Sequence, residues 1–249
     1  MPETNQTNQQ VYISQVELSC GLKLALPPYA EIDHLYREII VEDCYRINPQ
    51  SQWTKTWEEQ VTIIDIGAHA GLLSCLVAHF YPQGKVFAFE AHPTNHEVLQ
   101  QNIKVNQLEN QVTGYHLALA GENGTRQIFS APTPECNSTI MPEGEFYQDR
   151  LTMSGEVRCI SFDEALSLVG DEGDIDLLKI DCEGAEGEMF NAASDAAFDR
   201  IKRIGMEYHD DISILSSQDL IHLFKEKGFK TEIIPHEVWE YRGMIYASK

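Results

Sequence analysis

The sequence lacks the features that would place the chain in a membrane or in an oxidising compartment. No run approaches the roughly 20 consecutive apolar residues that cross a bilayer. Residues 1–10 are polar, without the basic start and apolar stretch of a signal peptide. The six cysteines are widely spaced and form no C-x-x-C pair, so we expect reduced thiols that are mostly buried. These absences predict a cytoplasmic chain.

Basic residues are also scarce. Lys and Arg number 18 against 39 Asp and Glu, which gives a formal net charge of −21. A field of this sign repels the phosphates of nucleic acids and of anionic membranes. We therefore expect neither a nucleic acid nor a membrane as a partner, and the sequence indicates no oligomeric state.

Short apolar strands alternate with amphipathic helices from Val61 onward. This alternation is typical of a parallel sheet covered on both faces, so the predicted fold class is α/β and doubly wound. The predicted strands are 61–66, 86–89, 111–119, 175–180, 201–208, 229–234 and 244–247, and the predicted helices are 71–81, 94–105, 161–169, 185–193 and 217–227.

The first quarter of the chain is predicted to cap this core. Residues 1–10 are predicted to be a disordered tail, and residues 11–60 a cap on a core of residues 61–249. Within the cap, alternating residues on both sides of Gly21 predict a hairpin, and apolar residues at helical spacing predict a helix over 32–45.

The carboxyl ends of the predicted strands carry polar motifs, and ligands of parallel sheets bind at these ends. The first core strand ends in Asp65 and Gly67-x-x-x-Gly71, where glycines let the backbone approach a ligand closely. This spacing departs from the dinucleotide pattern G-x-G-x-x-G, and the preceding acid suits an ammonium group better than a pyrophosphate. Glu90 ends the second strand, at the position from which an acid accepts hydrogen bonds from both hydroxyls of a ribose.

Two later strands end in further ionisable residues. Asp181 and Glu183 directly follow one predicted buried strand. Glu207 and His209 end the next one and point to the same side of it. Fixed charges at such positions generally serve a functional site. His92, at the start of a predicted helix, is expected to be exposed, as is His96.

These motifs together resemble those of FkbM-type methyltransferases. The resemblance spans roughly residues 17–249 and is densest from 61 to 209. The family commonly has Asn where this chain has His69, and Pro where it has Ala91. The matching runs are Asp65-Ile66-Gly67-Ala68-x-x-Gly71, Phe89-Glu90-Ala91-x-Pro93, Leu99-x-x-Asn102-x-x-x-Asn106 and, most specifically, Lys179-Ile180-Asp181-x-Glu183-Gly184-Ala185-Glu186.

The resemblance implies a class I methyltransferase fold, which is Rossmann-like with a mostly parallel seven-stranded sheet. It also implies S-adenosylmethionine as methyl donor and O-methylation, usually of sugars or secondary metabolites. The acceptor group is then a hydroxyl or carboxylate of a small molecule, sugar or peptide natural product. The predicted donor-binding residues are Asp65, Gly67, Ala68, His69, Gly71, Glu90, Ala91, Ala118 and Asp181.

For catalysis, we predict His209 as base or orienter, because the unperturbed pKa of histidine, roughly 6.5, lies nearest neutrality. Glu183 and Asp181 are predicted to shape the acceptor pocket, and the irregular segment 133–156 to cover it. Asp181, Glu207 and His209 could instead gather a divalent metal ion, although no metal is expected.

Two other functions share some of these features. A nicotinamide-dependent oxidoreductase has the same sheet and the same acid after the second strand, but it needs the missing middle glycine. A non-catalytic, adenosine-binding scaffold would also keep the fold. The presence of Asp65, Glu90, Asp181 and Glu183 argues against the scaffold.

Overall fold

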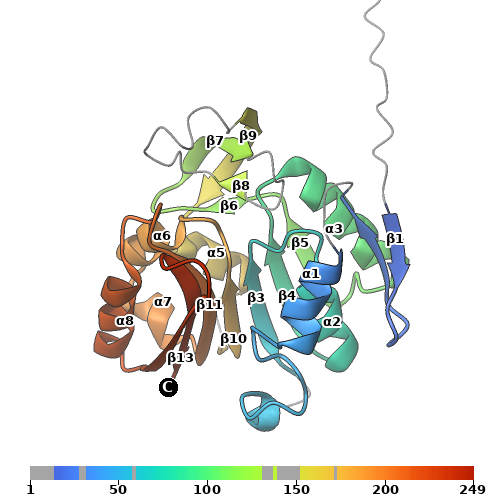
Figure 1. Ribbon diagram of the computed structural model, residues 1–249, viewed down its shortest axis with the longest axis horizontal. Helices are drawn as coiled ribbons and strands as arrows, with labels where there is room; N and C mark the ends of the chain where they lie inside the picture. The colour runs from blue at the N-terminus through green and yellow to red at the C-terminus, as the bar shows by residue number, and fades with distance from the viewer. Residues whose placement is uncertain (1–13, 28–31, 58–59, 131–136, 139–151, 171–172) are drawn as a thin grey trace, which may run out of the picture.

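The computed structural model describes residues 14–27, 32–57, 60–130, 137–138, 152–170 and 173–249. Its centre is a seven-stranded sheet with helices on both faces (Figure 1). The strand order is β12-β13-β11-β10-β3-β4-β5, in which β11, β10, β3, β4 and β5 are parallel and β13 is antiparallel to both of its neighbours. The predicted doubly wound α/β sheet is confirmed.

The strands and helices of this layered core lie close to their predicted positions. Its strands are β3 (Thr62–Ile66), β4 (Lys85–Phe89), β5 (Val112–Tyr115), β10 (Leu177–Ile180), β11 (Arg203–His209), β12 (Lys230–Pro235) and β13 (Arg242–Ser248). Its helices are α2 (Leu72–Phe80), α3 (Pro93–Val105), α5 (Phe162–Val169), α6 (Glu186–Ala192), α7 (Asp195–Asp199) and α8 (Ser217–Glu226). Helix α7 was not predicted.

Alternate residues of each central strand enter two separate apolar clusters. Ile64 and Ile66 of β3 pack with the side of the sheet covered by α5 to α8. Ile63 packs with α2, α3 and the N-terminal elements on the opposite face (Figure 1). Both faces of the sheet are therefore buried, which is why its strands read as continuous apolar runs in the sequence.

The N-terminal cap contains the predicted hairpin, formed by β1 (Ser14–Glu17) and β2 (Lys23–Leu26), which pair antiparallel. The predicted helix over 32–45 is shorter than expected. It consists of α1 (Ile32–Tyr36) and a π-helical turn (Arg37–Val41), and residues 42–45 leave the helix so that Tyr45 enters the core. A short 3₁₀ turn (Thr54–Thr56) follows. The predicted tail, residues 1–10, lies outside the described residues.

Two asparagines of α3 hold the hairpin. The side-chain amide of Asn102 accepts from Ala25 N at 2.6 Å and donates to the carbonyls of Ala25 at 2.8 Å and Ala70 at 2.7 Å. Four residues later, the amide of Asn106 pairs in the same way with the N–H and carbonyl of Lys23. The two amides thus supply the hydrogen bonds that a neighbouring strand would make to β2. Because residues four apart lie on the same face of a helix, this explains the L-x-x-N-x-x-x-N spacing.

A second, four-stranded sheet was not predicted. Its strands, in the order β6-β9-β7-β8, are β6 (Ala118–Leu119), β9 (Thr152–Ile160), β7 (Gly124–Ser130) and β8 (Asn137–Ser138). The predicted single strand over 111–119 was wrong, because the chain leaves the main sheet after Tyr115 and Ala118 pairs with Cys159 in the second sheet. The irregular segment predicted over 133–156 was wrong for β8 and for the start of β9. Its other residues lie outside the described ones.

Two smaller expectations are also corrected or limited. Among the described cysteines, Cys75 and Cys159 are buried, whereas Cys20, Cys44 and Cys182 are partly exposed. The thiols are therefore less buried than expected. Within the described part of the chain, no helix has the length and apolar character needed to cross a bilayer.

Asn102→Ala should destabilise the fold far more than Asn106→Ala. Asn102 is fully buried, so its removal leaves backbone groups without partners, at about 2–3 kcal/mol. Asn106 is partly exposed, and water can replace its amide, so its loss should cost less than about 1 kcal/mol. Urea unfolding of the two variants measures both values. Equal losses would show that the amides do not anchor the hairpin as described.

Candidate active site

The strand register brings the predicted motifs to one edge of the sheet. Ile66 is in register with Phe89 and with Ile180, and Ile180 is in register with Met206. The next residue of each strand or its loop therefore lies at the same edge. These residues are Gly67, Glu90, Asp181 and Glu207. From β3 the strand order continues through β4 and β5 on one side, and from β10 it continues through β11 on the other. The order of the strands therefore reverses between β3 and β10, and ligands of such sheets bind at this point of the edge.

The two motif glycines are required by contacts within the protein. Gly67 has a φ of 73°, and a Cβ there would lie 1.7 Å from the carbonyl oxygen of Asp181. Gly71 has a φ of 80°, and its Cβ would lie 2.3 Å from a methyl carbon of Leu99. From the sequence, these glycines were expected to let a ligand approach the backbone closely. The structure shows that the turn itself already demands them.

Between the glycines, His69 adopts a left-handed conformation with a φ of 51°. Asn is enriched in that region of φ and ψ, as is His, which accounts for the exchange of one for the other at this position. The backbone N–H of His69 donates to Glu90 at 2.7 Å. Burial, with help from Lys179, lowers the pKa of the ring to about 4, so the ring is neutral at physiological pH.

Glu90 is held by the turn on one side and by the start of α3 on the other. One carboxylate oxygen accepts from His69 N, and the other accepts from His92 N at 2.8 Å and from the Asn95 amide at 3.4 Å. Only 5% of the residue is exposed, and this burial raises its pKa to about 7. His92 was expected to be exposed but is buried as the residue that precedes α3, and His96 is partly buried.

Asp65 is fully enclosed. Its carboxylate lies 3.2 Å from the Lys179 ammonium and accepts a hydrogen bond from Ser74 Oγ at 2.6 Å. Lys179 also donates to the carbonyls of Gly67 at 2.7 Å and Ile66 at 3.3 Å. The acid that the sequence argument assigned to an ammonium ligand therefore already faces an ammonium group of the protein itself.

The remaining donor candidates border this turn. Ala68 is buried, and its N–H donates to the Phe89 carbonyl at 3.0 Å. Ala91 packs against a small apolar cluster that contains Ala118 and Ala120. Ala118 of β6 thus lies near the loop that follows Glu90, so the structure brings both predicted alanines together.

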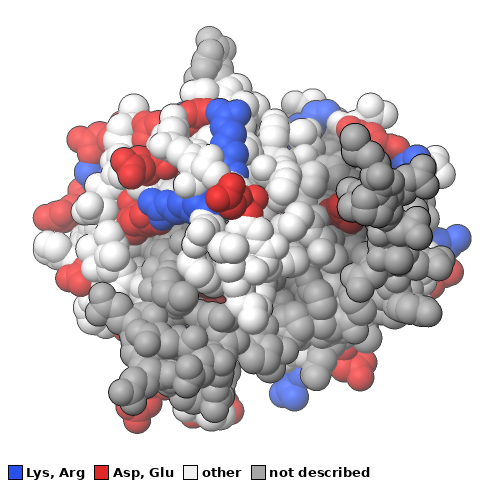
Figure 2. Space-filling model, turned by 90° about the horizontal axis from the view of Figure 1, so that it is seen from above, with Lys and Arg blue, Asp and Glu red and all other residues white. Residues whose placement is uncertain are grey.

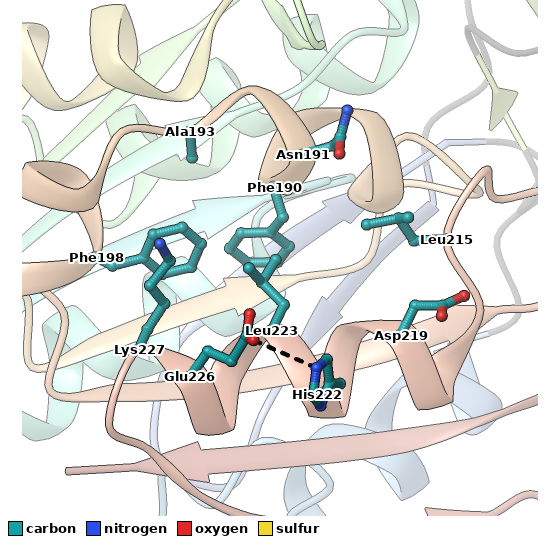
Figure 3. Close-up of a pocket in the computed structure, with 10 residues that line it drawn as sticks. All are labelled: Phe190, Asn191, Ala193, Phe198, Leu215, Asp219, His222, Leu223, Glu226 and Lys227. Atoms are coloured by element: carbon teal, nitrogen blue, oxygen red, sulfur yellow. Dashed lines mark ion pairs between the residues drawn. The ribbon is translucent and has the colours of Figure 1, made fainter.

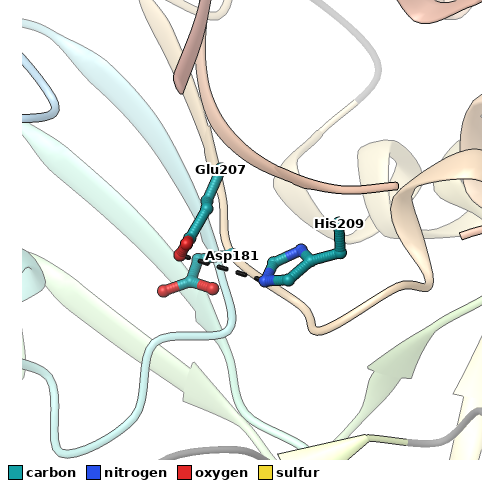
Figure 4. A group of neighbouring side chains, drawn as sticks. All are labelled: Asp181, Glu207 and His209. Atoms are coloured by element: carbon teal, nitrogen blue, oxygen red, sulfur yellow. Dashed lines mark ion pairs between the residues drawn. The ribbon is translucent and has the colours of Figure 1, made fainter. Parts of the chain in front are cut away.

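Asp181, Glu207 and His209 form a cluster at the ends of β10 and β11 (Figure 4). One ligand atom from each residue lies within 4.8 Å of the others. Asp181 and Glu207 are partly exposed, whereas His209 is fully buried. The imidazole Nε2 is 3.9 Å from Glu207 Oε2 and 3.4 Å from Glu183 Oε2, and Nδ1 is 2.9 Å from Glu186 Oε1.

The carboxylates control the charge of the imidazole. Burial lowers the pKa of His209, but Glu186 and Glu183 outweigh burial and raise the pKa to about 10. Without a bound ligand, the imidazole of His209 is therefore protonated at neutral pH and does not act as a general base. Burial and the charge of Asp181 also raise the pKa of Glu207, to about 8. Of the two roles predicted for His209, the geometry supports the orienter.

Two residues of the N-terminal cap lie at the site and were not predicted from the sequence. The hydroxyl of Tyr45 lies 3.3 Å from Asp181 Oδ2 and 3.4 Å from Glu38 Oε1, within hydrogen-bond distance of both. Tyr45 is 1% exposed. Burial, together with the charge of Asp181, raises the pKa of Glu38 to about 7. Neither residue stood in a motif, and only the folding of the cap against β10 brings them here.

A surface pocket of about 280 Å³ lies elsewhere, among α6, α7 and α8 (Figure 3). Its lining includes Phe190, Leu223 and the exposed ion pair of His222 with Glu226. None of the predicted site residues lines it, so we assign no catalytic role to it.

Comparisons with known proteins give a family match and several relatives. A sequence model described as the methyltransferase FkbM domain matches residues 65–231. The methyltransferase sdnD of Sordaria araneosa is 27% identical over 222 residues, which cover 80% of this chain and 82% of sdnD. The 31-O-demethyl-FK506 methyltransferase FkbM of Streptomyces tacrolimicus is 24% identical over 246 residues, which cover 87% of this chain and 89% of that protein.

A solved structure supports the fold. The methyltransferase FkbM from Methylobacillus flagellatus KT matches with a TM-score of 0.50 at 13% sequence identity. The match covers 79% of this chain and 46% of that one, so this chain spans less than half of that structure. At this identity the likeness shows the fold alone, and it confirms the class I methyltransferase architecture.

Lys179→Met should destabilise the protein by about 3–5 kcal/mol, because it leaves the Asp65 carboxylate buried without its counter-ion. The double variant Asp65→Asn/Lys179→Met should recover much of that loss, because no buried charge remains. Lys202→Met is the matched control. It breaks the partly exposed pair with Asp176 and should cost less than about 1 kcal/mol. Thermal unfolding compares the three, and a double variant no more stable than Lys179→Met would contradict this account.

Proposed function

The chain belongs to the FkbM methyltransferase family and is a methyltransferase, and we propose that it transfers the methyl group of S-adenosylmethionine to an oxygen of a small natural product. The observation that carries the proposal is the hydrogen bond by which the turn after β3 fixes the Glu90 carboxylate. Glu90 lies beside this turn, and the cluster of Asp181, Glu207 and His209 lies farther along the same strand edge. One end of the edge offers a site for the donor and the other a site for the acceptor.

The donor half is built around Glu90. Two backbone N–H groups fix its carboxylate, one on each oxygen. The oxygen bonded to His69 N keeps a further acceptor position, and on the other oxygen the second position holds only the long contact of 3.4 Å from Asn95. If a ribose hydroxyl displaces that contact, the two oxygens can accept hydrogen bonds from the two ribose hydroxyls of the donor. Gly67, Ala68, His69, Gly71, Ala91 and Ala118 form the surroundings of the proposed donor site.

The acceptor half must help a hydroxyl to lose its proton. In the reaction, the acceptor oxygen attacks the methyl carbon in line with the departing sulfur. The O–C bond forms, the C–S bond breaks with its electron pair moving to sulfur, and S-adenosylhomocysteine leaves neutral. The hydroxyl proton passes to Asp181, or to Glu207 in its ionised form, which predominates only above its pKa of about 8. His209 orients these acids, and Glu183 shapes the pocket beside them.

The acceptor class rests on similarity and on charge. The name of the Streptomyces tacrolimicus relative describes a methyltransferase of 31-O-demethyl-FK506. For this chain we propose a hydroxyl or carboxylate of a sugar, secondary metabolite or peptide natural product. In the described part of the face shown in Figure 2, acidic side chains are spread widely and Lys and Arg form no continuous band. Together with the net charge of −21, this supports an acceptor other than a nucleic acid.

The family match favours a methyltransferase over the nicotinamide-dependent oxidoreductase that the sequence left open. A non-catalytic scaffold would need neither the acceptor-side acids nor the positioned His209. Turnover therefore separates the scaffold from the enzyme.

Glu90→Ala should weaken the binding of S-adenosylmethionine and of S-adenosylhomocysteine at least about tenfold, since two hydrogen bonds to a charged acceptor are lost. Wild-type affinity should fall as pH drops through about 7, where Glu90 gains a proton and loses acceptor capacity. His69 stays neutral across that range, because its pKa is about 4. Calorimetry at pH 6 and 8 (about one unit either side of that pKa) measures this. An undiminished affinity in Glu90→Ala would refute the assignment of the ribose site.

Incubation with methyl-labelled donor and an extract of small metabolites should yield a labelled product. Mass spectrometry should find it, and the chemical shift of the methyl carbon should place the label on oxygen. Glu207→Gln should lower kcat by about 10²–10⁴ and leave donor affinity within about twofold. The surface variant Glu226→Gln serves as the control, because its carboxylate is exposed on α8. A methyl group found on nitrogen would disprove the proposed acceptor chemistry.

A further inference from the structure

His209 is held as histidines at metal centres are held. Its Nδ1 lies 2.9 Å from Glu186 Oε1, and both residues are fully buried. Glu186 is itself fixed, because its other oxygen accepts from Gly184 N at 2.9 Å. With Nδ1–H donated to this carboxylate, the ring presents Nε2 to the cluster. A carboxylate that orients a ring in this way is the usual outer partner of a metal-binding histidine.

The Nε2 atom is enclosed and makes no hydrogen bond to any residue that the structure describes. It points toward the carboxylates of Asp181 and Glu207 (Figure 4), and the Glu183 carboxylate lies 3.4 Å away without forming a hydrogen bond to it. Buried polar atoms normally have a hydrogen-bond partner, and a bound ion or water accounts for one that lacks it. This buried atom therefore marks a place for a ligand.

The two carboxylates are positioned for the same ligand. Asp181 follows β10 directly, and its Oδ2 lies 3.3 Å from the Tyr45 hydroxyl. Glu207 lies on the neighbouring strand, two residues before His209 and on the same side of it. The nearby Glu183 lies 3.4 Å from the Arg242 guanidinium, which compensates its charge. The neighbouring strands β10 and β11 thus present Asp181 and Glu207 together with the imidazole.

We infer that Asp181, Glu207 and His209 bind a divalent cation of the Mg²⁺ or Mn²⁺ class. Carboxylate oxygens favour these hard ions, and one imidazole is compatible with Mn²⁺. At the bond lengths of such ions, neighbouring ligand atoms lie about 3 Å apart and opposite ones about 4 Å apart. The atoms here lie within 4.8 Å of one another, so small side-chain rotations close the site. The cation takes the place of the proton on Nε2 of His209, because a histidine binds a metal ion through an unprotonated nitrogen.

The inference deepens the proposed function and rests on it for the role of the ion. A cation held there would lower the pKa of the acceptor hydroxyl and so ease the transfer of its proton to a neighbouring carboxylate. It also fixes the oxygen beside the donor half of the site. Binding of the ion itself does not depend on that role.

Titration of metal-stripped protein with Mn²⁺, followed by electron paramagnetic resonance of the free ion, tests the site. About 0.2 M salt should screen weak binding to the acidic surface. We expect one tight site per chain, weakened at least tenfold in Asp181→Asn and in Glu207→Gln. The matched control is His222→Gln/Glu226→Gln, which removes an exposed His–Glu pair and should bind Mn²⁺ as the wild type does.

His209→Gln tests the imidazole directly. Because the ring is buried against Glu186, circular dichroism checks that this variant folds, and the two carboxylate variants keep the test decisive if it does not. Equal Mn²⁺ affinity in wild type, Asp181→Asn and Glu207→Gln would overturn the inference. Donor binding is measured on the same samples. Donor binding without tight Mn²⁺ binding overturns the ion site alone, whereas Mn²⁺ binding without donor binding supports the ion site and overturns the proposed function.

Discussion

The ammonium group of Lys179 is the interaction on which the site depends. It is buried in the sheet, lies 3.2 Å from Asp65, donates to the Gly67 carbonyl and stands 5.3 Å from the centre of the Tyr45 ring. Its charge favours the ionised forms of Glu38 and Glu90 and disfavours a charge on the His69 ring. One cation thus joins the turn after β3, the end of β10 and the N-terminal cap. The buried acids at this edge can coexist because this charge lies between them.

The main sheet could be predicted from the sequence because its signal is local. Strands such as β3 and β10 are buried on both faces, and their apolar runs alternate with amphipathic helices. The ends of those runs predicted the edge where Glu90 and Asp181 lie. The second sheet gave no such signal, because only Ile128 of β7 is buried and the residues of this strand show no apolar alternation. Its pairing with β9 joins residues that are distant in the chain, which local patterns do not reveal.

The site shows the same division between local and distant information. Its acids and glycines stand in motifs, but their partners do not. Tyr45 and Glu38 reach Asp181 only through the packing of the cap on the sheet. The pKa of His209 departs from the unperturbed value for a similar reason. Glu186 lies 23 residues away in the sequence, yet it contacts the ring and governs its charge. The residue types predicted where the candidate site lies, whereas the surroundings of His209 determine whether its ring carries a proton.

The way in which the cap is attached has an evolutionary consequence. Asn102 and Asn106 bond to backbone groups of β2, so residues of β2 can be exchanged without loss of these bonds, provided that its buried positions stay apolar. The segment that follows the hairpin brings Tyr45 and Glu38 to Asp181, on the proposed acceptor side, and its Leu35 packs against the cluster that contains Ala70 of the turn after β3. Substitutions at Glu38 or Tyr45 therefore change the surroundings of Asp181 directly, whereas the hydrogen bonds that hold Glu90 come from other segments of the chain. A lineage could change the proposed acceptor side in this way while it keeps the proposed donor side.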